Sequence, residues 1–387
     1  MRIALLTYST KPRGSVIHSL ELANAFHQIG HQVCIYALDK DGLGFDRPIP
    51  CTYQPIPAKA ASQEIDQLIR QRINEFVTFL EGHLRKDCHT IFHAQDCISA
   101  NALAVLRQRG LIPHFVRTVH HIEDYQSTYL LQCQEQSIRQ PDLCLCVSSY
   151  WQQQLIQQYQ VSALRVINGV DLGRFSFQDA PQDLSLKRRL NISGSPVFLT
   201  VGGIEPRKNT LQLVKAFAQV RQLLPQAQLI IAGGATLFDY REYREEFLQM
   251  VNALDLESAI LLPGVISDQD LPSLYRCADA FVFPSLKEGW GLVVLEAIAS
   301  GLPTVVSHRA PFTEFLSPEQ TIFIPPEDSS AIALAMHQSV QPKLAQSLFH
   351  NSRSILQFYS WTASAIMHLN HYQALLHARN SLSDPMA

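Results

Sequence analysis

The chain has 387 residues, of which 47% are hydrophobic and 17% charged, and its formal net charge at pH 7 is −3. This composition is typical of a folded globular protein and excludes a largely disordered one. The small net charge gives no indication of nucleic-acid binding or of strong electrostatic attachment to a membrane. Because the chain is longer than one hydrophobic core usually organises, we expect two domains.

The sequence favours a cytoplasmic protein. Apolar runs fall short of the roughly 20 residues that cross a bilayer, and "MRIALLTYST" is a poor signal peptide. The eight cysteines are scattered and form no C-x-x-C motif, so we expect small buried hydrophobic residues in a reducing compartment. The oligomeric state is not predicted.

The first half of the chain alternates short apolar runs with longer amphipathic stretches. The pattern predicts a strand at 2–8, a helix at 15–30 that ends at Gly30, and a strand at 31–38. Residues 69–86 have the mixed charge of an ordinary surface helix, and peripheral membrane contact is the alternative. Further strands are predicted at 90–95, 115–121, 143–149 and 164–169. This β-α-β alternation predicts a parallel sheet covered by helices on both faces.

The second half repeats this pattern after a polar, turn-rich stretch at 169–196, which is expected to be a linker. A strand is predicted at 197–203 and a helix at 209–224, followed by a final helix at 360–378. Other strands are predicted at 227–234, 259–264, 280–285 and 303–307. We therefore expect an α/β protein of two doubly wound domains, residues 1–170 and 171–357, with a C-terminal helix and tail at 358–387. The carboxyl ends of both sets of strands are expected to line a ligand-binding cleft.

The stretch "PSLKEGWGLVVLEAIASGLPTVVS" carries two acidic residues around a glycine-rich turn. Gly289 and Gly291 flank Trp290 ahead of a predicted helix, so the backbone there can approach a ligand closely. The N–H groups of Gly291, Leu292 and Val293 would form a phosphate site at the helix start. Glu296, about 6 Å further along the helix at roughly 1.5 Å per residue, is placed to hold a ribose diol. Glu288 would face the group attached to the far phosphate.

A second loop, "VGGIEPRKNT", follows the first strand of the second half. Arg207 and Lys208 lie in it and hence at the same carboxyl edge, where they could neutralise a diphosphate. An Arg-Lys pair in such a loop is more often simply solvated, but the acid-rich turn at the same edge favours a binding role.

With these residues the chain resembles the retaining GT-B glycosyltransferases of glycosyltransferase family 4, whose hallmark is two glutamates separated by seven residues. Glu288 and Glu296 have that separation. The resemblance covers nearly the whole chain, through "TVHH", "VINGVDLGRF", "VGGIEPRKN", "LLPGVISDQDLPSLYRCADAFVFPS" and the late "SWTASA". It implies a GT-B fold, with an acceptor-side N-terminal domain, a donor-binding C-terminal domain and a C-terminal helix that returns to the N-terminal domain. It also implies a nucleotide diphosphate sugar as donor substrate with no cofactor, retention of configuration, and no bound metal.

The resemblance also assigns roles to single residues. Glu288 would contact hydroxyls of the transferred sugar, Glu296 the ribose, Lys208 the diphosphate, and His120 the sugar near the reacting centre. The family often has an arginine where this chain has Gly203, and we assign the phosphate contact of that arginine to Arg207. The usual glycine pair near the N-terminus is here Gly14 and Ser15. The predicted site comprises Glu288 and His120 as catalytic residues, with donor contacts from Gly14, Ser15, Gly203, Arg207, Lys208, Gly264, Ile266, Gly289, Trp290, Gly291, Leu292, Val293 and Glu296.

Several other patterns in the sequence allow alternative interpretations. The adjacent histidines His120 and His121 are poorly placed to share a metal, because neighbours at a strand end project in different directions. His121 and Glu123 are predicted to meet the acceptor. The D-x-D triplets at 39–41 and 268–270 are interpreted as loop and helix-cap acids. G-x-G-x-x-G is absent from "KPRGSVIHS", which argues against an NAD enzyme. A sugar-nucleotide epimerase and a non-catalytic nucleotide-sugar-binding protein stay open as alternatives, and the base, sugar and acceptor are not predicted.

Overall fold

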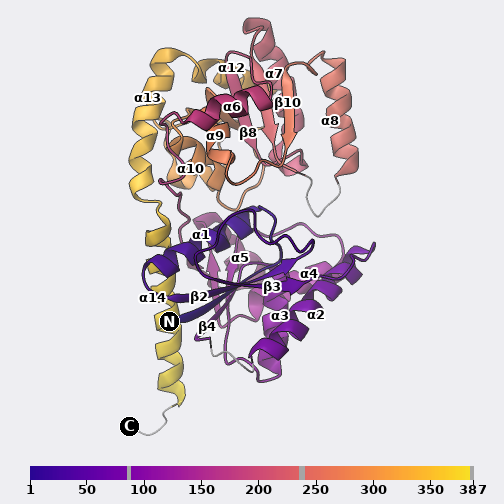
Figure 1. The fold of residues 1–387 in the computed structure, drawn as a ribbon, viewed down its shortest axis with the longest axis vertical. Coiled ribbons are helices and arrows are strands. Elements are labelled where there is room, and N and C mark those ends of the chain that lie inside the picture. Colours follow the sequence, from indigo (N-terminus) through magenta and orange to yellow (C-terminus); the bar gives the residue numbers. More distant parts are fainter. Residues whose placement is uncertain (85–88, 235–239, 384–387) are drawn as a thin grey trace. The chain divides into compact units, whose positions relative to one another are not determined.

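The computed structural model describes residues 1–84, 89–234 and 240–383. The chain divides into two compact units. Unit 1 consists of Met1–Gly169 and Tyr359–Ala387, and unit 2 of Val170–Phe358. Each unit is built around a parallel sheet with helices on both faces (Figure 1). The predicted doubly wound halves are confirmed.

Within the described residues, unit 1 contains a seven-stranded sheet in the order β3-β2-β1-β4-β5-β6-β7, and each neighbouring pair is parallel. The direction of winding reverses between β1 and β4, which are adjacent strands. Their bounds are β1 (Arg2–Thr7), β2 (Gln32–Asp39), β3 (Thr52–Pro57), β4 (Ile91–Ala94), β5 (Val116–Val119), β6 (Leu143–Cys146) and β7 (Leu164–Arg165).

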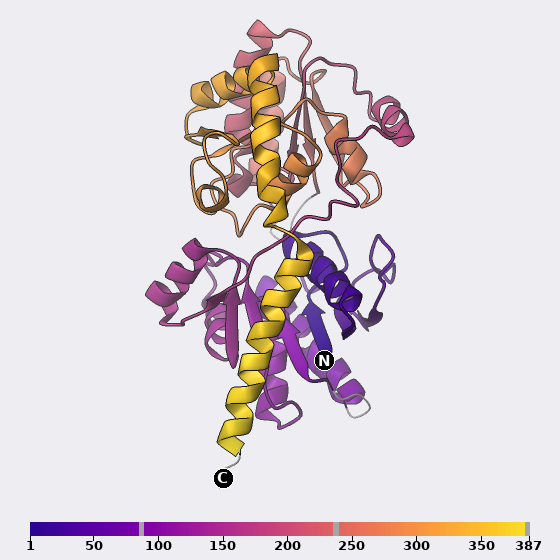
Figure 2. The ribbon, with the colours of Figure 1, turned by 90° about the vertical axis from the view of Figure 1, so that its left-hand side faces the viewer.

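The helices of unit 1 form two groups. One is a series in which each helix packs on the next: α2 (Ile65–Leu84), α3 (Cys97–Gln108), α4 (Thr128–Arg139) and α5 (Ser149–Tyr159). The other pairs α1 (Gly14–Gln28) with α14 (Trp361–Ser383), the C-terminal helix that Figure 2 shows alongside α1. The predicted surface helix at 69–86 corresponds to α2, and its last two residues lie outside the described residues.

Unit 2 contains, among the described residues, a six-stranded parallel sheet in the order β10-β9-β8-β11-β12-β13. Here the winding reverses between β8 and β11. The strands are β8 (Val197–Val201), β9 (Gln228–Ala232), β10 (Ile260–Gly264), β11 (Ala280–Phe283), β12 (Thr304–Ser307) and β13 (Ile322–Ile324). The helices are α6 (Pro181–Arg189), α7 (Thr210–Leu223), α8 (Arg241–Ala253), α9 (Leu271–Arg276), α10 (Leu292–Ala299), α11 (Phe312–Phe315), α12 (Ser329–Ser339) and α13 (Pro342–Ser352).

Several details differ from the sequence-based expectation: β13 was not predicted, and the strand predicted at 164–169 ends at Arg165. The stretch at 169–196 is not a continuous linker, because it contains α6, which begins at Pro181 and ends in three basic residues. The Asp183 carboxylate accepts the backbone N–H of Ala180 at 2.9 Å, so this short helix is capped. Strand β3 was missed because it contains Pro55 and Pro57, which an edge strand tolerates.

Each unit has its own apolar core. In unit 2 the core includes Phe198, Phe217 and Phe247, which are fully buried between the sheet and helices α7 and α8. In unit 1 the core between the sheet and helices α2 and α3 includes the fully buried Phe76 and Phe115. Over the part of the chain that the structure describes, no helix is both long and apolar enough to cross a membrane.

Candidate functional site

The candidate site of unit 2 lies where the winding of its sheet reverses. The loop after β8 carries Arg207 and Lys208, and the loop after β11 carries Glu288. Because β8 and β11 are parallel neighbours, both loops leave the same edge of the sheet side by side. Backbone contacts join them: Leu286 N–H donates to the carbonyl oxygen of Arg207 at 2.8 Å. Open parallel sheets bind their ligands at such a reversal point.

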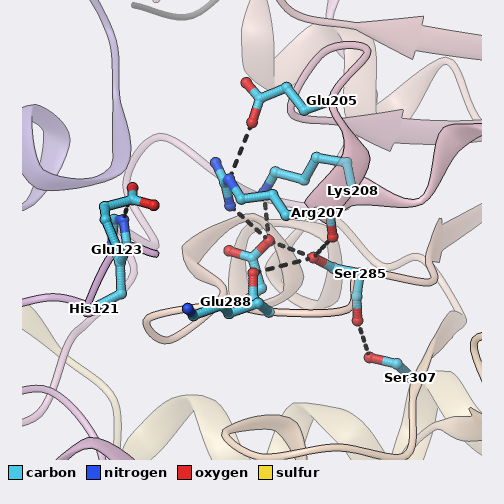
Figure 3. Close-up of polar contacts among 9 residues, drawn as sticks. His121, Glu123, Glu205, Arg207, Lys208, Ser285, Glu288 and Ser307 are labelled. Carbon is cyan, nitrogen blue, oxygen red and sulfur yellow. Dashed lines mark hydrogen bonds and ion pairs between the residues drawn. The ribbon is translucent and has the colours of Figure 1, made fainter. Parts of the chain in front are cut away.

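The side chain of Glu288 is only 9% exposed and is surrounded by donors (Figure 3). Its Oε1 atom accepts from Lys208 Nζ at 2.6 Å and from Arg207 at 3.1 Å. The Ser285 hydroxyl lies 2.6 Å from the same oxygen. Glu288 is therefore not a solvated loop acid. Both cations that sequence reasoning assigned to a diphosphate contact this carboxylate.

The charges of Arg207, Lys208 and Glu288 determine which of these side chains are ionised. Burial opposes ionisation of Glu288, but the charges of Lys208 and Arg207 outweigh it and lower its pKa to about 2. Burial, followed by the charge of Arg207, lowers the pKa of Lys208 to about 8, although Glu288 acts in the opposite direction. At pH 7 Glu288 is ionised and Lys208 is mostly protonated. The cluster then holds a compensated set of charges away from bulk water.

A second carboxylate orients Arg207 from the other side. Glu205, only 2% exposed, pairs with Arg207 Nε at 3.0 Å. The Arg207 guanidinium thus lies between two carboxylates (Figure 3). On β12, the Ser307 hydroxyl donates to the carbonyl oxygen of Ser285 at 2.7 Å and supports the turn that bears Glu288. The site is held by side chains from three neighbouring strand ends.

The Gly-Trp-Gly turn leads directly into helix α10. Gly291 has φ +103°, and a Cβ at this position would lie 2.5 Å from Cε1 of Phe312. Only glycine suits both constraints. Trp290 is buried and stacks on Phe315 with ring centroids 4.7 Å apart. The side chain of Trp290 therefore packs inside the unit and holds the turn in place. The donor contact predicted for this stretch would then come from the backbone of Gly289, Gly291, Leu292 and Val293.

Glu296 lies on α10 and is buried. Its Oε2 atom accepts a hydrogen bond from the hydroxyl of Tyr275 at 2.8 Å. Burial and the charge of Glu296 raise the pKa of Tyr275 well above its usual range, so the phenol stays a donor. This contact from α9 explains how a carboxylate is tolerated on a helix of apolar residues.

The remaining predicted contacts of unit 2 lie at the same sheet edge. Gly203 follows β8 with φ +78°, and a Cβ there would lie 2.7 Å from the carbonyl oxygen of Gly234. Gly264 ends β10, and Ile266 follows in a half-buried turn. Parallel strands β10 and β8 both end at this edge, with β9 between them. The structure thus places Gly203, Gly264 and Ile266 on the edge that carries Glu288.

In unit 1 the predicted residues follow β1 and β5. Gly14 and Ser15 form the first turn of α1, and a Cβ on Gly14 would meet no atom within 4 Å. His120 follows β5, and its Nε2 atom lies 3.0 Å from Gln95 Oε1. Burial lowers the pKa of His120 well below its usual range, and nearby His18 adds to the effect. His120 is therefore a neutral imidazole at pH 7.

His121 and Glu123 form a pair within unit 1, with 2.5 Å between His121 Nε2 and Glu123 Oε1. Both side chains are about a third exposed. Across residues 1–84, 89–234 and 240–383, no three His, Cys, Asp or Glu side chains are grouped so that they could hold a metal ion. Of the D-x-D triplets, Asp41 pairs with Lys11, Asp268 with Arg174 and Asp270 with Arg189.

Three contributors were missed at the sequence level. Glu205 lies two residues before Arg207 and Ser285 three residues before Glu288, and these spacings were an available signal. Tyr275 had no such signal, because α9 meets α10 only in the folded unit.

Comparison with known proteins shows that the chain is similar to glycosyltransferases. A sequence model described as "Glycosyltransferase Family 4" matches residues 12–174, and one described as "Glycosyl transferases group 1" matches residues 183–352. Mannosylfructose-phosphate synthase of Agrobacterium fabrum is 30% identical over 206 residues, which cover 51% of this chain and 44% of that protein. O-antigen chain mannosyltransferase B of Escherichia coli is 28% identical over 257 residues, 64% of each chain. The chain thus matches less than two thirds of either relative's length.

Solved structures share the whole fold. Sucrose-phosphate synthase from Thermosynechococcus elongatus superposes with a TM-score of 0.82 at 23% identity, covering 97% of this chain and 99% of that one. HepE of Anabaena in complex with UDP-glucose gives 0.76 at 19% identity, covering 98% and 100%. Two parallel-sheet Rossmann-like domains of this kind define the GT-B fold. The chain thus has the GT-B fold, with residues 183–352 matching the glycosyl transferases group 1 and residues 12–174 matching glycosyltransferase family 4.

Proposed function

We propose that this protein transfers a hexose-type sugar from a nucleotide diphosphate sugar to an acceptor hydroxyl, with retention of anomeric configuration and without a metal ion. The observation that carries the proposal is the buried Glu288 carboxylate, held by Lys208, Arg207 and Ser285 where the unit 2 sheet reverses its winding. Names of relatives point the same way, since they include mannosyltransferases and sugar-phosphate synthases. A HepE structure contains UDP-glucose.

Donor binding follows from the charges of this cluster. A diphosphate approaching the start of α10 would compete with Glu288 for Lys208 and Arg207, and the α10 amides would add further donors. Glu288 would then be released towards the sugar hydroxyls, while Glu296 holds the ribose. In this scheme the two side-chain cations and the helix amides provide the charge compensation that other transferases obtain from a metal.

The proposed chemistry involves one bond exchange. The bond from the anomeric carbon to the leaving phosphate oxygen breaks, and the acceptor oxygen bonds to that carbon on the same face. The leaving phosphate oxygen takes the proton of the acceptor hydroxyl. Lys208 and Arg207 stabilise the negative charge of the leaving group, and Glu288 supports the positive character of the sugar. His120 of unit 1 is proposed to contact the transferred sugar, and His121 and Glu123 the acceptor.

The test is a screen against UDP-, GDP-, ADP- and dTDP-sugars by thermal shift and mass spectrometry, with Glu288→Gln as the matched variant. We expect one nucleotide to stabilise both proteins and only the wild type to release its sugar slowly to water or to an acceptor. Full transfer by Glu288→Gln would exclude the assigned role. Interconversion of the sugar without release would favour an epimerase, and binding without turnover in the wild type a non-catalytic protein.

A further inference from the structure

A buried polar chain in unit 1 connects the C-terminal helix to His120. The hydroxyl of Tyr372, on α14, lies 2.6 Å from His93 Nδ1. The other ring nitrogen of His93 lies 2.7 Å from the Thr118 hydroxyl. The Gln95 amide nitrogen lies 3.3 and 3.4 Å from the two nitrogens of that ring. Gln95 Oε1 in turn lies 3.0 Å from His120 Nε2.

The surroundings of His93 settle which way the Gln95 amide faces. Both ring nitrogens of His93 already have a hydroxyl partner at hydrogen-bonding distance, one from Tyr372 and one from Thr118. The amide nitrogen of Gln95 is nearly equidistant from the two ring nitrogens, so it lies against the face of the ring and not in line with either lone pair. An aromatic face attracts an N–H group and repels a carbonyl oxygen. The NH₂ group of Gln95 therefore faces His93, and its carbonyl oxygen faces His120.

This orientation fixes the proton on His120. A carbonyl oxygen accepts only, so the His120 nitrogen that contacts it must carry the proton. We propose that Gln95 is a positioning residue that holds His120 as the Nε2–H tautomer, leaving Nδ1 as the hydrogen-bond acceptor for a substrate hydroxyl. The role of that acceptor rests on the proposed function, whereas the tautomer itself does not. Tyr372 and His93 hold the Gln95 amide in place, so α14 also contributes to fixing the tautomer of His120.

The position of this chain in the sheet agrees with a role in the site. Gln95 directly follows β4, and β4 is adjacent to β1 where the winding of the unit 1 sheet reverses. His18 of α1 restrains the His120 ring from another side, with ring centroids 4.7 Å apart and an interplanar angle of 76°. The ring is thus held by elements that flank the reversal point.

The direct test is nitrogen-15 spectroscopy of the histidine rings in the full-length protein, without any ligand, at pH 8. Long-range proton–nitrogen spectra show which ring nitrogen carries the proton, and a His120→Gln variant assigns the signal. We expect His120 as the Nε2–H tautomer in the wild type. Gln95→Leu should lose this preference, and Gln95→Glu should retain it because a carboxylate also accepts a hydrogen bond from Nε2–H.

A matched pair of tyrosine variants tests the extension to α14. Tyr372 and Tyr36 are both fully buried, and each hydroxyl contacts a histidine, His93 at 2.6 Å and His89 at 2.9 Å respectively. Changing either to phenylalanine removes one buried hydroxyl. We expect only Tyr372→Phe to alter the His120 signal. An unchanged signal in Tyr372→Phe would overturn the link to α14.

Kinetics separates positioning from general damage. Gln95→Leu should lower kcat about tenfold, the rate equivalent of about one net hydrogen bond, while the Kd for UDP or the nucleotide found in the donor screen stays unchanged. A His120 signal that stays Nε2–H in Gln95→Leu would overturn the proposal whatever the activity. If Gln95→Leu changes the His120 signal but the wild-type protein transfers no sugar, the positioning by Gln95 is supported and the proposed transfer is rejected.

Discussion

Lys208 is a buried cation whose main partner is a buried anion. Its side chain and that of Glu288 are each about 10% exposed. Without Lys208, Arg207 alone would face the carboxylates of Glu288 and Glu205, which leaves a net negative charge in a poorly solvated place. We expect Lys208→Met to lower the free energy of unfolding by about 3 kcal/mol, measured by urea unfolding at pH 7. The double variant with Glu288→Gln should regain part of that loss.

The control for this prediction is an exposed pair in the same unit. Arg309 and Glu327 form an ion pair with side chains 43% and 61% exposed. Arg309→Met should change the free energy of unfolding by less than about 1 kcal/mol, because water screens such pairs. Equal losses in Arg309→Met and Lys208→Met would mean that burial of the Glu288 cluster does not matter.

Two glycines of the predicted donor site are expected to behave differently. Gly203→Ala should destabilise the protein by about 2 kcal/mol, because its φ is +78° and the new Cβ would lie 2.7 Å from a backbone oxygen. Gly14→Ala should leave the melting temperature unchanged, since its Cβ would meet open space. If Gly14 contacts the donor as proposed, the KM for the nucleotide sugar should rise about fivefold, or about 1 kcal/mol. An unchanged KM would remove Gly14 from the donor site.

At the scale of elements, the packing of α1 against α14 depends on neutral histidines. His18 on α1 and His368 on α14 are fully buried, with ring centroids 5.8 Å apart. Burial lowers the pKa of His18 to about 4 and that of His368 to about 3. In the unfolded chain these groups take up a proton near pH 6.5. The unfolded state therefore binds more protons below that pH, and stability falls as the pH decreases towards the folded-state values.

The expected loss is about 1.4 kcal/mol per pH unit for each histidine in this window. Thermal unfolding at pH 8 and pH 5 should show a clear decrease in Tm for the wild type. His368→Gln removes one titrating group, so its decrease should be smaller. His350, which is exposed on α13, provides the control His350→Gln. A decrease in His368→Gln as large as that of the wild type would contradict the assignment.

The elements also show what a sequence can and cannot predict. Strands such as β8 and β11 are continuous apolar runs, and their alternation with amphipathic helices was sufficient for the doubly wound class. Glu288, Lys208 and Arg207 were found because they lie in loops at strand ends. Their mutual pairing was not predicted, because it depends on the strand order that makes β8 and β11 neighbours. Helix α6 was missed because its composition is polar, although Pro181 and the basic last turn were available signals.

At the scale of the whole molecule, the two units differ in how the chain builds them. Unit 2 is one continuous stretch, Val170–Phe358, whereas unit 1 needs the distant segment Tyr359–Ala387. That segment supplies α14, whose Tyr372 packs against Phe26 of α1 and contacts His93 of β4. A fragment of residues 1–169 would leave these buried groups uncovered. Unit 1 is thus completed only when the chain returns from unit 2.

This asymmetry predicts the behaviour of fragments. Residues 170–358 contain their own apolar core and the whole Glu288 cluster, so this fragment should fold alone with a cooperative thermal transition. Its Kd for the nucleotide diphosphate should exceed that of the full chain about fivefold, or about 1 kcal/mol, by calorimetry, because the fragment lacks the proposed contact of Gly14. Residues 1–169 should aggregate alone and become folded when a 359–387 peptide is added, because the peptide restores the contacts of α14 with α1 and β4. Folding of 1–169 without that peptide would show that α14 is dispensable for unit 1. A 170–358 fragment that folds without binding nucleotide would place essential donor contacts in unit 1.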